Sequence, residues 1–202
     1  MEGTEYRTKK SILRRAQEVI GIPLKDVDTT GRLATGKGAI GTVIEESWFG
    51  YSPNSESEPD FPEAGVELKV TPYLRGRNGI RAKERLVCNI INYMEEYDKT
   101  FHTSAFWHKC ETILLMSYEH LLDRPKGDFK IDAAILFSFP EEDLVIIEHD
   151  WETIMERCVA VEHMNFPREI RCILPLVQKA QQQLVCVLSR FRLFLPSSVL
   201  IL

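Results

Sequence analysis

Closely spaced cysteines are absent from this chain of 202 residues. Its five cysteines lie far apart and include no Cys-x-x-Cys pair, which argues against a disulfide framework and against a zinc site. They are Cys88, Cys110, Cys158, Cys172 and Cys186. The five histidines also lack metalloprotease spacing such as His-Glu-x-x-His. We therefore expect a protein of a reducing compartment, for which the cytoplasm is the best fit.

Export signals, membrane spans and an excess of positive charge are missing as well. The chain starts Met-Glu-Gly-Thr-Glu, with acids where a signal peptide carries positive charge. The stretch from Leu184 to Leu202 approaches the length of a membrane span, but Arg190, Arg192 and Pro196 interrupt it, so we expect no membrane anchor. Lys and Arg total 25 against 30 Asp and Glu, a net charge of -5. Any contact with nucleic acid must therefore come from a local basic patch.

What is present is a globular composition and a mixture of helical and strand patterns. Apolar residues make up 44% of the chain and charged residues 27%, as in an ordinary folded domain. Apolar periodicity predicts helices over residues 8–21, 40–49 and 140–162. Alternation and apolar runs predict strands over 64–71, where Thr71-Pro72 ends the strand, and over 85–91, 112–118 and 133–139. These elements predict an α/β protein with a central sheet flanked by helices.

A nuclease-like motif lies at the first expected strand. Asp60 follows a proline, and Glu67-Leu68-Lys69 begins after six intervening residues, which is the Pro-Asp-x(n)-[Asp/Glu]-x-Lys pattern of metal-dependent nucleases. Residues two apart on a strand project from one face, so Glu67 and Lys69 point the same way. The turn 62–65 can fold Asp60 back beside Glu67, so that two carboxylates converge on one cation. Lys69 can then orient or deprotonate an attacking water. The alternative is a chance match on a solvated strand face.

Charge is distributed unevenly around this motif. Residues 41–68 hold seven acids and no Lys or Arg, whereas residues 69–85 hold six cations and one acid. Arg75, Arg77 and Arg81 belong to this second stretch and flank a turn at Asn78-Gly79, which makes them candidate contacts to DNA phosphates. An acidic metal pocket beside a cationic stripe suits the cleavage of phosphodiester bonds.

Three longer segments carry a specific resemblance. Residues 37–45, 60–69 and 83–93 strongly resemble the MutH-like endonucleases of the PD-(D/E)xK nuclease superfamily, and residues 48–50 and 82–93 resemble the restriction branch of that family more closely. The similarity covers about residues 9–151. It implies a restriction-endonuclease-like fold, with a mixed central sheet flanked by helices, and a catalytic domain over residues 1–165.

The resemblance also implies the roles of the motif residues. Asp60 and Glu67 bind Mg²⁺ in such enzymes, with the main-chain carbonyl at the position of Leu68 as a further ligand. Lys69 corresponds to the catalytic lysine. The implied cofactor is therefore Mg²⁺, and the implied substrate is double-stranded DNA.

Further residues match the family outside the short motif. Glu45 matches an additional catalytic acid, although an apparent one-residue insertion leaves Glu46 as an alternative. Lys37 and Lys109 match basic positions near the DNA. For Lys37, a solvated loop charge is an equally good explanation.

The implied activity is hydrolysis of phosphodiester bonds at GATC sites, by a type II restriction or mismatch-repair-type nuclease. Residues 166–202 depart from the family, because apolar runs with no acid after Glu169 replace mixed charge. This shift suggests a truncated or frameshifted end and puts GATC recognition in doubt. The alternative is a non-catalytic DNA-binding remnant. The sequence does not decide whether one DNA strand or both are cut, or how methylation affects cutting. It also leaves open whether two copies of the chain assemble as a homodimer on a palindromic site.

Overall fold

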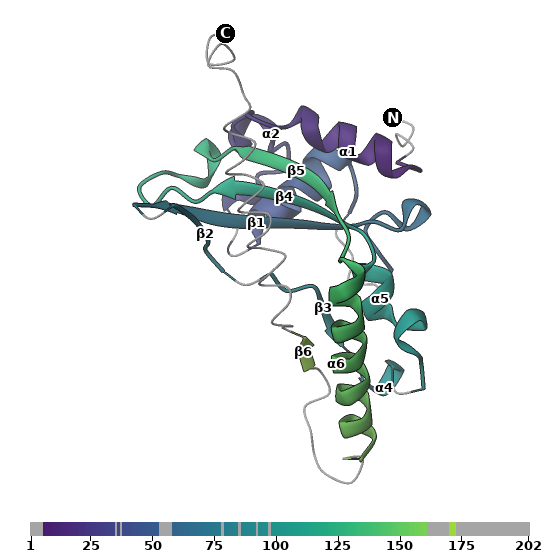
Figure 1. The fold of residues 1–202 in the computed structure, drawn as a ribbon. Coiled ribbons are helices and arrows are strands. Elements are labelled where there is room, and N and C mark those ends of the chain that lie inside the picture. The colour runs from purple at the N-terminus through teal and green to yellow at the C-terminus, as the bar shows by residue number, and fades with distance from the viewer. Residues whose placement is uncertain are drawn as a thin grey trace.

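The computed structural model shows a central sheet with helices on both sides (Figure 1). It describes residues 6–34, 36, 38–52, 58–77, 79–84, 86–91, 93–96, 98–160 and 170–172, with the backbone alone described at 89–91, 93–94, 157–160 and 170–172. Lys37 lies outside the described residues, as does the expected aberrant tail apart from Ile170–Cys172.

A mixed four-stranded sheet forms the centre, in the order β2-β1-β4-β5. Strand β1 (Glu67–Gly76) runs parallel to β4 (Ile113–Glu119) and antiparallel to β2 (Gly79–Ala82), and β5 (Ile131–Phe137) is antiparallel to β4. A separate two-stranded sheet pairs β3 (Asn89–Ile91) with β6 (Ile170–Cys172). The mixed sheet and its flanking helices confirm the α/β class expected from the sequence.

Short helices and one long helix surround the sheet. The α-helices are α1 (Lys9–Glu18), α2 (Leu24–Val27), α3 (Ala39–Val43), α4 (Tyr93–Glu96), α5 (Ala105–Cys110) and α6 (Glu141–Ala160). The π-helical segment η2 (Ile44–Phe49) continues α3, and single 3-10 turns occupy η1 (Arg32–Ala34), η3 (Pro62–Ala64), η4 (Phe101–Thr103) and η5 (Lys126–Asp128). In the described part of the chain, no helix has the length and apolar character needed to cross a membrane.

Helix boundaries follow local sequence signals. Thr8 caps α1, because its side chain accepts a hydrogen bond from the Ser11 N–H at 3.1 Å. Pro140 precedes α6, whose first turn carries Glu141, Glu142 and Asp143 at the positive end of the helix dipole. The expected helices are therefore present: the first is shorter, over Lys9–Glu18, the second is the continuous run of α3 and η2, and α6 is described from Glu141 to Ala160.

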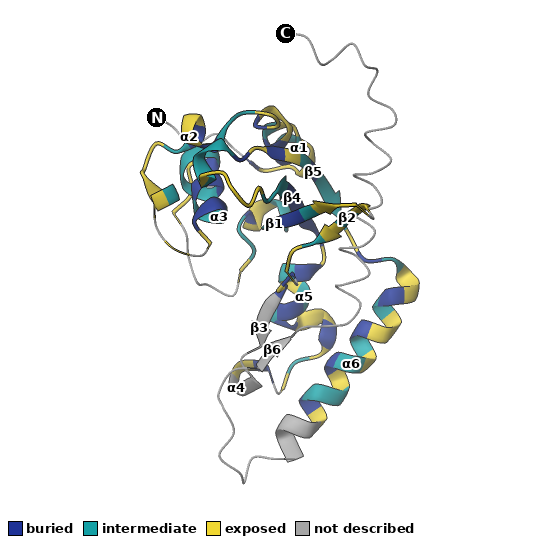
Figure 2. Cartoon of the chain, turned by 90° about the vertical axis from the view of Figure 1, so that its left-hand side faces the viewer, coloured by how far each residue is buried: buried dark blue, intermediate teal, exposed yellow. Residues whose placement is uncertain are grey.

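Two hydrophobic cores lie on opposite faces of the sheet. Leu114 and Met116 of β4 pack into a core with Ile12 of α1, whereas the alternate residues Ile113 and Leu115 pack into a second core. Phe106 of α5 and Trp151 of α6 also belong to the second core. Figure 2 shows α1, α2 and α3 on one side of the sheet and α5 and α6 on the other. Leu68 belongs to the first core, so its neighbours Glu67 and Lys69 face the second.

Two expected strand boundaries are wrong. Pro72 does not end β1, which runs on to Gly76. The β1–β2 ladder begins at the pair Tyr73–Ala82, so no neighbouring strand requires an N–H from Pro72. The expected strand over 85–91 is not the next strand of the main sheet, because β2 takes that place, and among the described residues 86–91 only β3 (89–91) forms a strand, in the second sheet.

Candidate functional site

A tight turn returns Asp60 to the start of β1. Phe61 and Val66 pair through two main-chain hydrogen bonds of 2.9 and 3.2 Å, and η3 with Gly65 in a left-handed conformation (φ +60°) closes the turn between them. The Asp60 carboxylate then accepts a hydrogen bond from the Leu68 N–H at 2.8 Å. The expected turn is therefore present, and it fixes Asp60 next to Glu67.

Glu67 forms ion pairs with two lysines that come from different elements. Its Oε1 lies 2.6 Å from Nζ of Lys69, which shares its face of β1. Its Oε2 lies 3.9 Å from Nζ of Lys109 on α5. The Glu67 side chain is only 4% exposed and that of Lys109 13%. Sequence comparison had suggested Lys109 only as a basic position near DNA, and the fold places it against a motif carboxylate.

Helix α5 is held firmly where it carries Lys109. Ser104 caps the helix by accepting the Trp107 N–H at 3.0 Å, and the buried Glu96 carboxylate accepts the Ala105 N–H at 3.0 Å. These contacts orient a short helix of Ala105–Cys110 that could not be stable alone. No sequence signal shows that this helix reaches β1, because the contact depends on tertiary packing.

Glu45 lies near the motif carboxylates, whereas Glu46 pairs with Arg32. Burial raises the pKa of Glu45 to about 7, with further raising by the negative charges of Asp60 and Glu67, which therefore lie close to it. The Glu46 carboxylate instead accepts hydrogen bonds from both Nε and Nη2 of Arg32, at 2.9 and 2.8 Å. That hydrogen-bonded pair lowers the pKa of Glu46. Adjacent acids on the π-helical segment thus face different surroundings.

The charges of the site are only partly balanced. Burial raises the pKa of Glu67, Lys69 lowers it, and the nearby Asp60 carboxylate raises it again. Burial alone would lower the pKa of Lys69, but the attraction of Glu67 outweighs burial and raises it. Lys69 is therefore a cation at neutral pH, surrounded by carboxylates that repel one another.

These residues fit a hard divalent cation. Oε2 of Glu67 is buried and accepts no hydrogen bond from the described residues, although buried oxygens ordinarily have a partner. The Leu68 N–H points to Asp60, so the Leu68 carbonyl, which shares that strand edge, faces the same space. Within the described ranges, no three His, Cys, Asp or Glu side chains form a complete metal site. Mg²⁺ needs only one or two carboxylates, since it retains several waters.

Comparison with known proteins agrees with this geometry. Residues 49–150 match the family described as "DNA mismatch repair enzyme MutH". The chain belongs to the MutH family. It is 39% identical over 152 residues to the type II restriction enzyme Sau3AI of Staphylococcus aureus, covering 74% of this chain and 31% of that enzyme. It is 30% identical over 156 residues to the DNA mismatch repair protein MutH of Shewanella woodyi, covering 74% and 66%. The chain thus spans about a third of one relative and two thirds of the other.

The MutH match includes most of the site, since Asp60, Glu67, Lys69 and Lys109 lie within residues 49–150. Glu45 precedes the matched region; the resemblance of residues 37–45 to the family suggested this acid, and the fold places it near the motif carboxylates.

The arginines of the β1–β2 hairpin lie away from this carboxylate site. They are Arg75, Arg77 and Arg81. At about 3.3 Å per residue, Arg75 is about 26 Å along β1 from Glu67. Its Nε forms an ion pair with Oε2 of Glu119 at 3.3 Å, and its guanidinium lies 5.9 Å from the Tyr73 ring. The fold therefore separates these three expected DNA contacts from the carboxylates, whereas Lys109 lies beside them.

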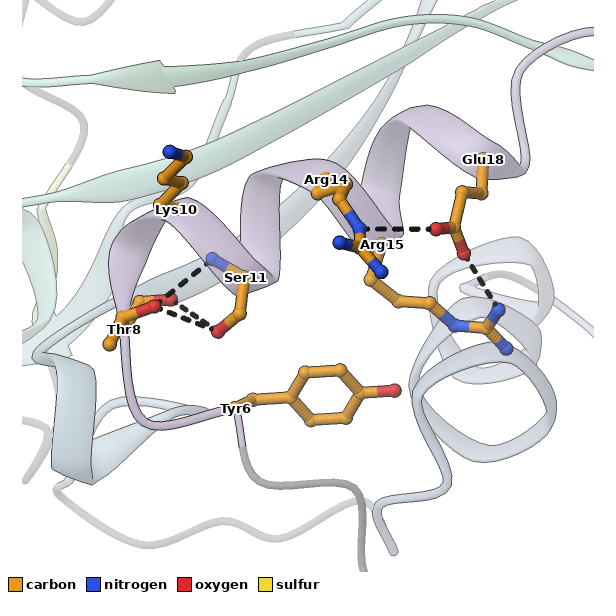
Figure 3. A pocket seen from close by; sticks show the side chains of 7 residues that line it. All are labelled: Tyr6, Thr8, Lys10, Ser11, Arg14, Arg15 and Glu18. Atoms are coloured by element: carbon orange, nitrogen blue, oxygen red, sulfur yellow. Dashed lines mark hydrogen bonds and ion pairs between the residues drawn. The ribbon is translucent and has the colours of Figure 1, made fainter.

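A hollow of about 530 Å³ lies along α1 (Figure 3). Its lining consists of Tyr6, Thr8, Lys10, Ser11, Arg14, Arg15 and Glu18. Glu18 forms ion pairs with Arg14 and Arg15 at 3.6 and 3.1 Å, and Arg15 also stacks 3.8 Å from the Trp48 ring. None of the expected site residues lines this hollow, so it is separate from the carboxylate site.

Proposed function

We propose that this chain is the catalytic region, over residues 1–165, of a Mg²⁺-dependent endonuclease that hydrolyses phosphodiester bonds in double-stranded DNA. The observation that carries the proposal is the buried Glu67 carboxylate at the start of β1, which forms ion pairs with the ammonium groups of Lys69 and Lys109, while the Asp60 carboxylate is held by the Leu68 N–H of the same strand. Membership of the MutH family supports it, because a type II restriction enzyme and DNA mismatch repair proteins are among the relatives.

In this proposal, Asp60, Glu67 and the Leu68 carbonyl hold the cation. When bound, Mg²⁺ polarises the scissile phosphate and lowers the pKa of water. The Asp60 carboxylate is already oriented by the Leu68 N–H, and Oε2 of Glu67 has no hydrogen bond to lose. Binding the cation therefore requires little rearrangement beyond loosening the ion pairs of Glu67 with Lys69 and Lys109.

In the proposed mechanism, the lysines stabilise negative charges and Glu45 accepts a proton. Lys69 is cationic at neutral pH, so its ammonium orients the attacking water and stabilises the charge that develops on the phosphoryl oxygens. Lys109 adds to the larger effect of Lys69 in lowering the pKa of the Glu67 carboxyl, against the burial that raises it. A carboxyl with a pKa of about 7 is well matched to accept a proton at neutral pH, and Glu45 is that group. In-line attack then leaves a 5′-phosphate and a 3′-hydroxyl.

The proposed target is GATC, as in the family that the chain resembles, and its palindromic symmetry is compatible with a homodimer. Lys37, Arg77 and Arg81 are the proposed phosphate contacts outside the catalytic site, with Arg75 held in place by Glu119. The specificity-determining part of the proposal depends on chain beyond that shared with the relatives, since only 31% of the restriction enzyme is covered.

Cleavage of a duplex with a single GATC site, compared with a scrambled duplex, tests the proposal. We expect Mg²⁺-dependent cleavage that a chelator abolishes. Glu45→Gln should lower the rate by about 10²-fold, the usual contribution of a proton-transfer residue. Its matched control, Glu46→Gln, removes the same charge one residue away and should leave cleavage nearly unchanged. Binding of DNA without cleavage under all conditions would favour the non-catalytic alternative.

A further inference from the structure

Two buried thiols meet in the second hydrophobic core. Cys88 and Cys110 are each 1% exposed, and both belong to the core formed with α5 and α6. Helix α5, which ends at Cys110, packs against β3, which begins directly after Cys88. The two thiols are in hydrogen-bond contact. The two thiols are therefore neighbours in space, although 21 residues separate them in the chain.

This pair lies directly beneath the lysines of the proposed catalytic site. The Lys69 ammonium is close enough for its charge to act on the Cys88 thiol. Cys110 follows Lys109, whose Nζ lies 3.9 Å from the Glu67 carboxylate. Any covalent change at the thiols is therefore transmitted to two of the charges around Glu67.

Of the two buried thiols, Cys88 is the one whose surroundings favour the thiolate. The hydrogen bond from Cys110 lowers the pKa of Cys88, burial opposes this effect, and the Lys69 cation lowers the pKa further. The pKa of Cys110 is raised, because its hydrogen bond to Cys88 and its burial both favour the protonated thiol. One thiol is thus the attacking group and its neighbour the resolving group.

We propose that Cys88 and Cys110 form a disulfide under oxidation by a peroxide, and that this disulfide reversibly disables the adjacent site. The regulatory half of this inference rests on the proposed nuclease function. Cys88 attacks one peroxide oxygen, the O–O bond breaks, and the leaving hydroxide takes a proton to become water. The Cys110 sulfur then attacks the Cys88 sulfenic acid, the S–S bond forms, and a second water leaves. One peroxide is reduced to two waters as two thiols are oxidised.

Disulfide formation must move α5. The sulfur atoms of a disulfide are about 2.05 Å apart, closer than any hydrogen-bonded pair of thiols. Because α5 is a single short helix, drawing Cys110 towards Cys88 also shifts Lys109 relative to Glu67. A displacement of about 1 Å in a catalytic group is enough to cost about 10²-fold in rate. Disulfides in reducing compartments are commonly catalytic or redox-sensing, which agrees with a switch.

The full chain treated with hydrogen peroxide provides the test, with peptide mapping by mass spectrometry as the first readout. We expect a Cys88–Cys110 disulfide, a mass about 2 Da below the reduced chain, and its disappearance with dithiothreitol. Cleavage should fall at least about tenfold with the disulfide and recover with the reductant. The Cys88→Ser/Cys110→Ser variant should keep its cleavage rate in peroxide. The matched Cys158→Ser/Cys186→Ser variant should remain sensitive.

Three results would overturn the inference. The first is a peptide map with no Cys88–Cys110 bond. The second is an oxidised chain that carries the bond and cleaves DNA as fast as the chain with reduced thiols. The third is equal peroxide sensitivity in both double variants. If the reduced chain does not cleave DNA at all, the nuclease proposal fails by itself, and the peptide map still decides whether the thiol pair forms its disulfide.

Discussion

Glu45 and Glu46 are neighbours in the sequence with opposite electrostatic surroundings. Burial and the nearby carboxylates raise the pKa of Glu45 to about 7, whereas the Arg32 guanidinium lowers the pKa of Glu46. The sequence left the choice between these acids open, because a one-residue insertion shifts the match by one position. The rotation between adjacent residues of the helical turn places Glu45 beside the motif carboxylates and Glu46 against Arg32, and we therefore propose Glu45 as the accessory acid.

The raised pKa of Glu45 predicts a stability profile for the metal-free protein. The folded state binds this proton more tightly than the unfolded state, whose pKa is near 4.5. The stabilising contribution is therefore complete below about pH 4.5 and is lost as the pH rises through about 7. At about 1.4 kcal/mol per pH unit, the loss is up to about 3 kcal/mol. Glu45→Gln should remove it, so that the unfolding free energy falls less between pH 5 and pH 8 than in the wild type.

Glu46→Gln is the control for this measurement, and its effect has the opposite sign. The folded pKa of Glu46 is lowered, so its contribution is present above the unfolded pKa and is lost as the pH falls. Chemical denaturation at pH 5 and pH 8 measures both variants; this window lies above the titration of Glu46, so Glu46→Gln should keep the pH dependence of the wild type. An unchanged pH dependence in Glu45→Gln would show that Glu45 is solvated like an ordinary surface acid.

At the scale of elements, the turn before β1 fixes the distance between the motif carboxylates. Gly65 adopts φ +60°, and a Cβ there would meet no atom within 4 Å, so only backbone strain opposes a side chain. Gly65→Ala should destabilise the protein by about 1–2 kcal/mol and lower cleavage, because relief of the strain displaces Asp60. Gly41→Ala in α3 is the control, since its Cβ is equally unhindered and alanine favours a helix by up to about 1 kcal/mol. Thermal melts and cleavage rates of both variants measure this, and equal stability of the two would contradict it.

The β1–β2 hairpin should contact DNA only at a distance from the cleaved bond. Since Arg75 is about 26 Å from Glu67 along β1, the hairpin reaches phosphates roughly eight base pairs away. Arg77→Ala/Arg81→Ala should weaken binding and flatten the salt slope by up to about one unit per lost contact. The effect should occur with flanks of about 12 base pairs and vanish with flanks of about 4.

The control for the hairpin variant is Lys10→Ala/Arg14→Ala. It also removes two cations, but from α1, on the sheet face opposite the one to which Glu67 points. Its salt slope should match the wild type on both duplexes. A hairpin variant with an unchanged slope on the long duplex would identify the arginines as ordinary solvated charges.

Local patterns predicted β1 well at its start and poorly at its end. Alternation of Val66, Leu68 and Val70 with charged residues correctly placed Glu67 and Lys69 on one face, because a strand has a period of two. The end at Pro72 was wrong, because whether a strand needs a proline N–H depends on where its neighbour stops. The turn over residues 62–65 was predictable from local residues, since glycine and proline determine it.

For the whole molecule, the sheet separates two cores, and the proposed site lies where they meet. The α/β class followed from the order of periodic segments, because each element must bury one apolar face. The approach of Lys109 to Glu67, and of Cys88 to Cys110, could not be predicted in this way. These contacts join elements that are far apart in sequence, and no local pattern specifies them. Family similarity supplied Lys109 as a basic position, and packing supplied its partner.

The central claim is that Asp60 and Lys69 belong to one catalytic pocket that faces a scissile phosphate. The measurement is DNA affinity in a chelator, by fluorescence anisotropy on a GATC duplex, together with cleavage in Mg²⁺. Asp60→Asn removes a negative charge, so binding without metal should be equal or tighter, while cleavage is lost. Lys69→Ala removes a positive charge, so binding should weaken and cleavage should also be lost. Thermal melts must show both variants folded. Retained cleavage in either folded variant, or affinities that weaken together, would contradict the claim.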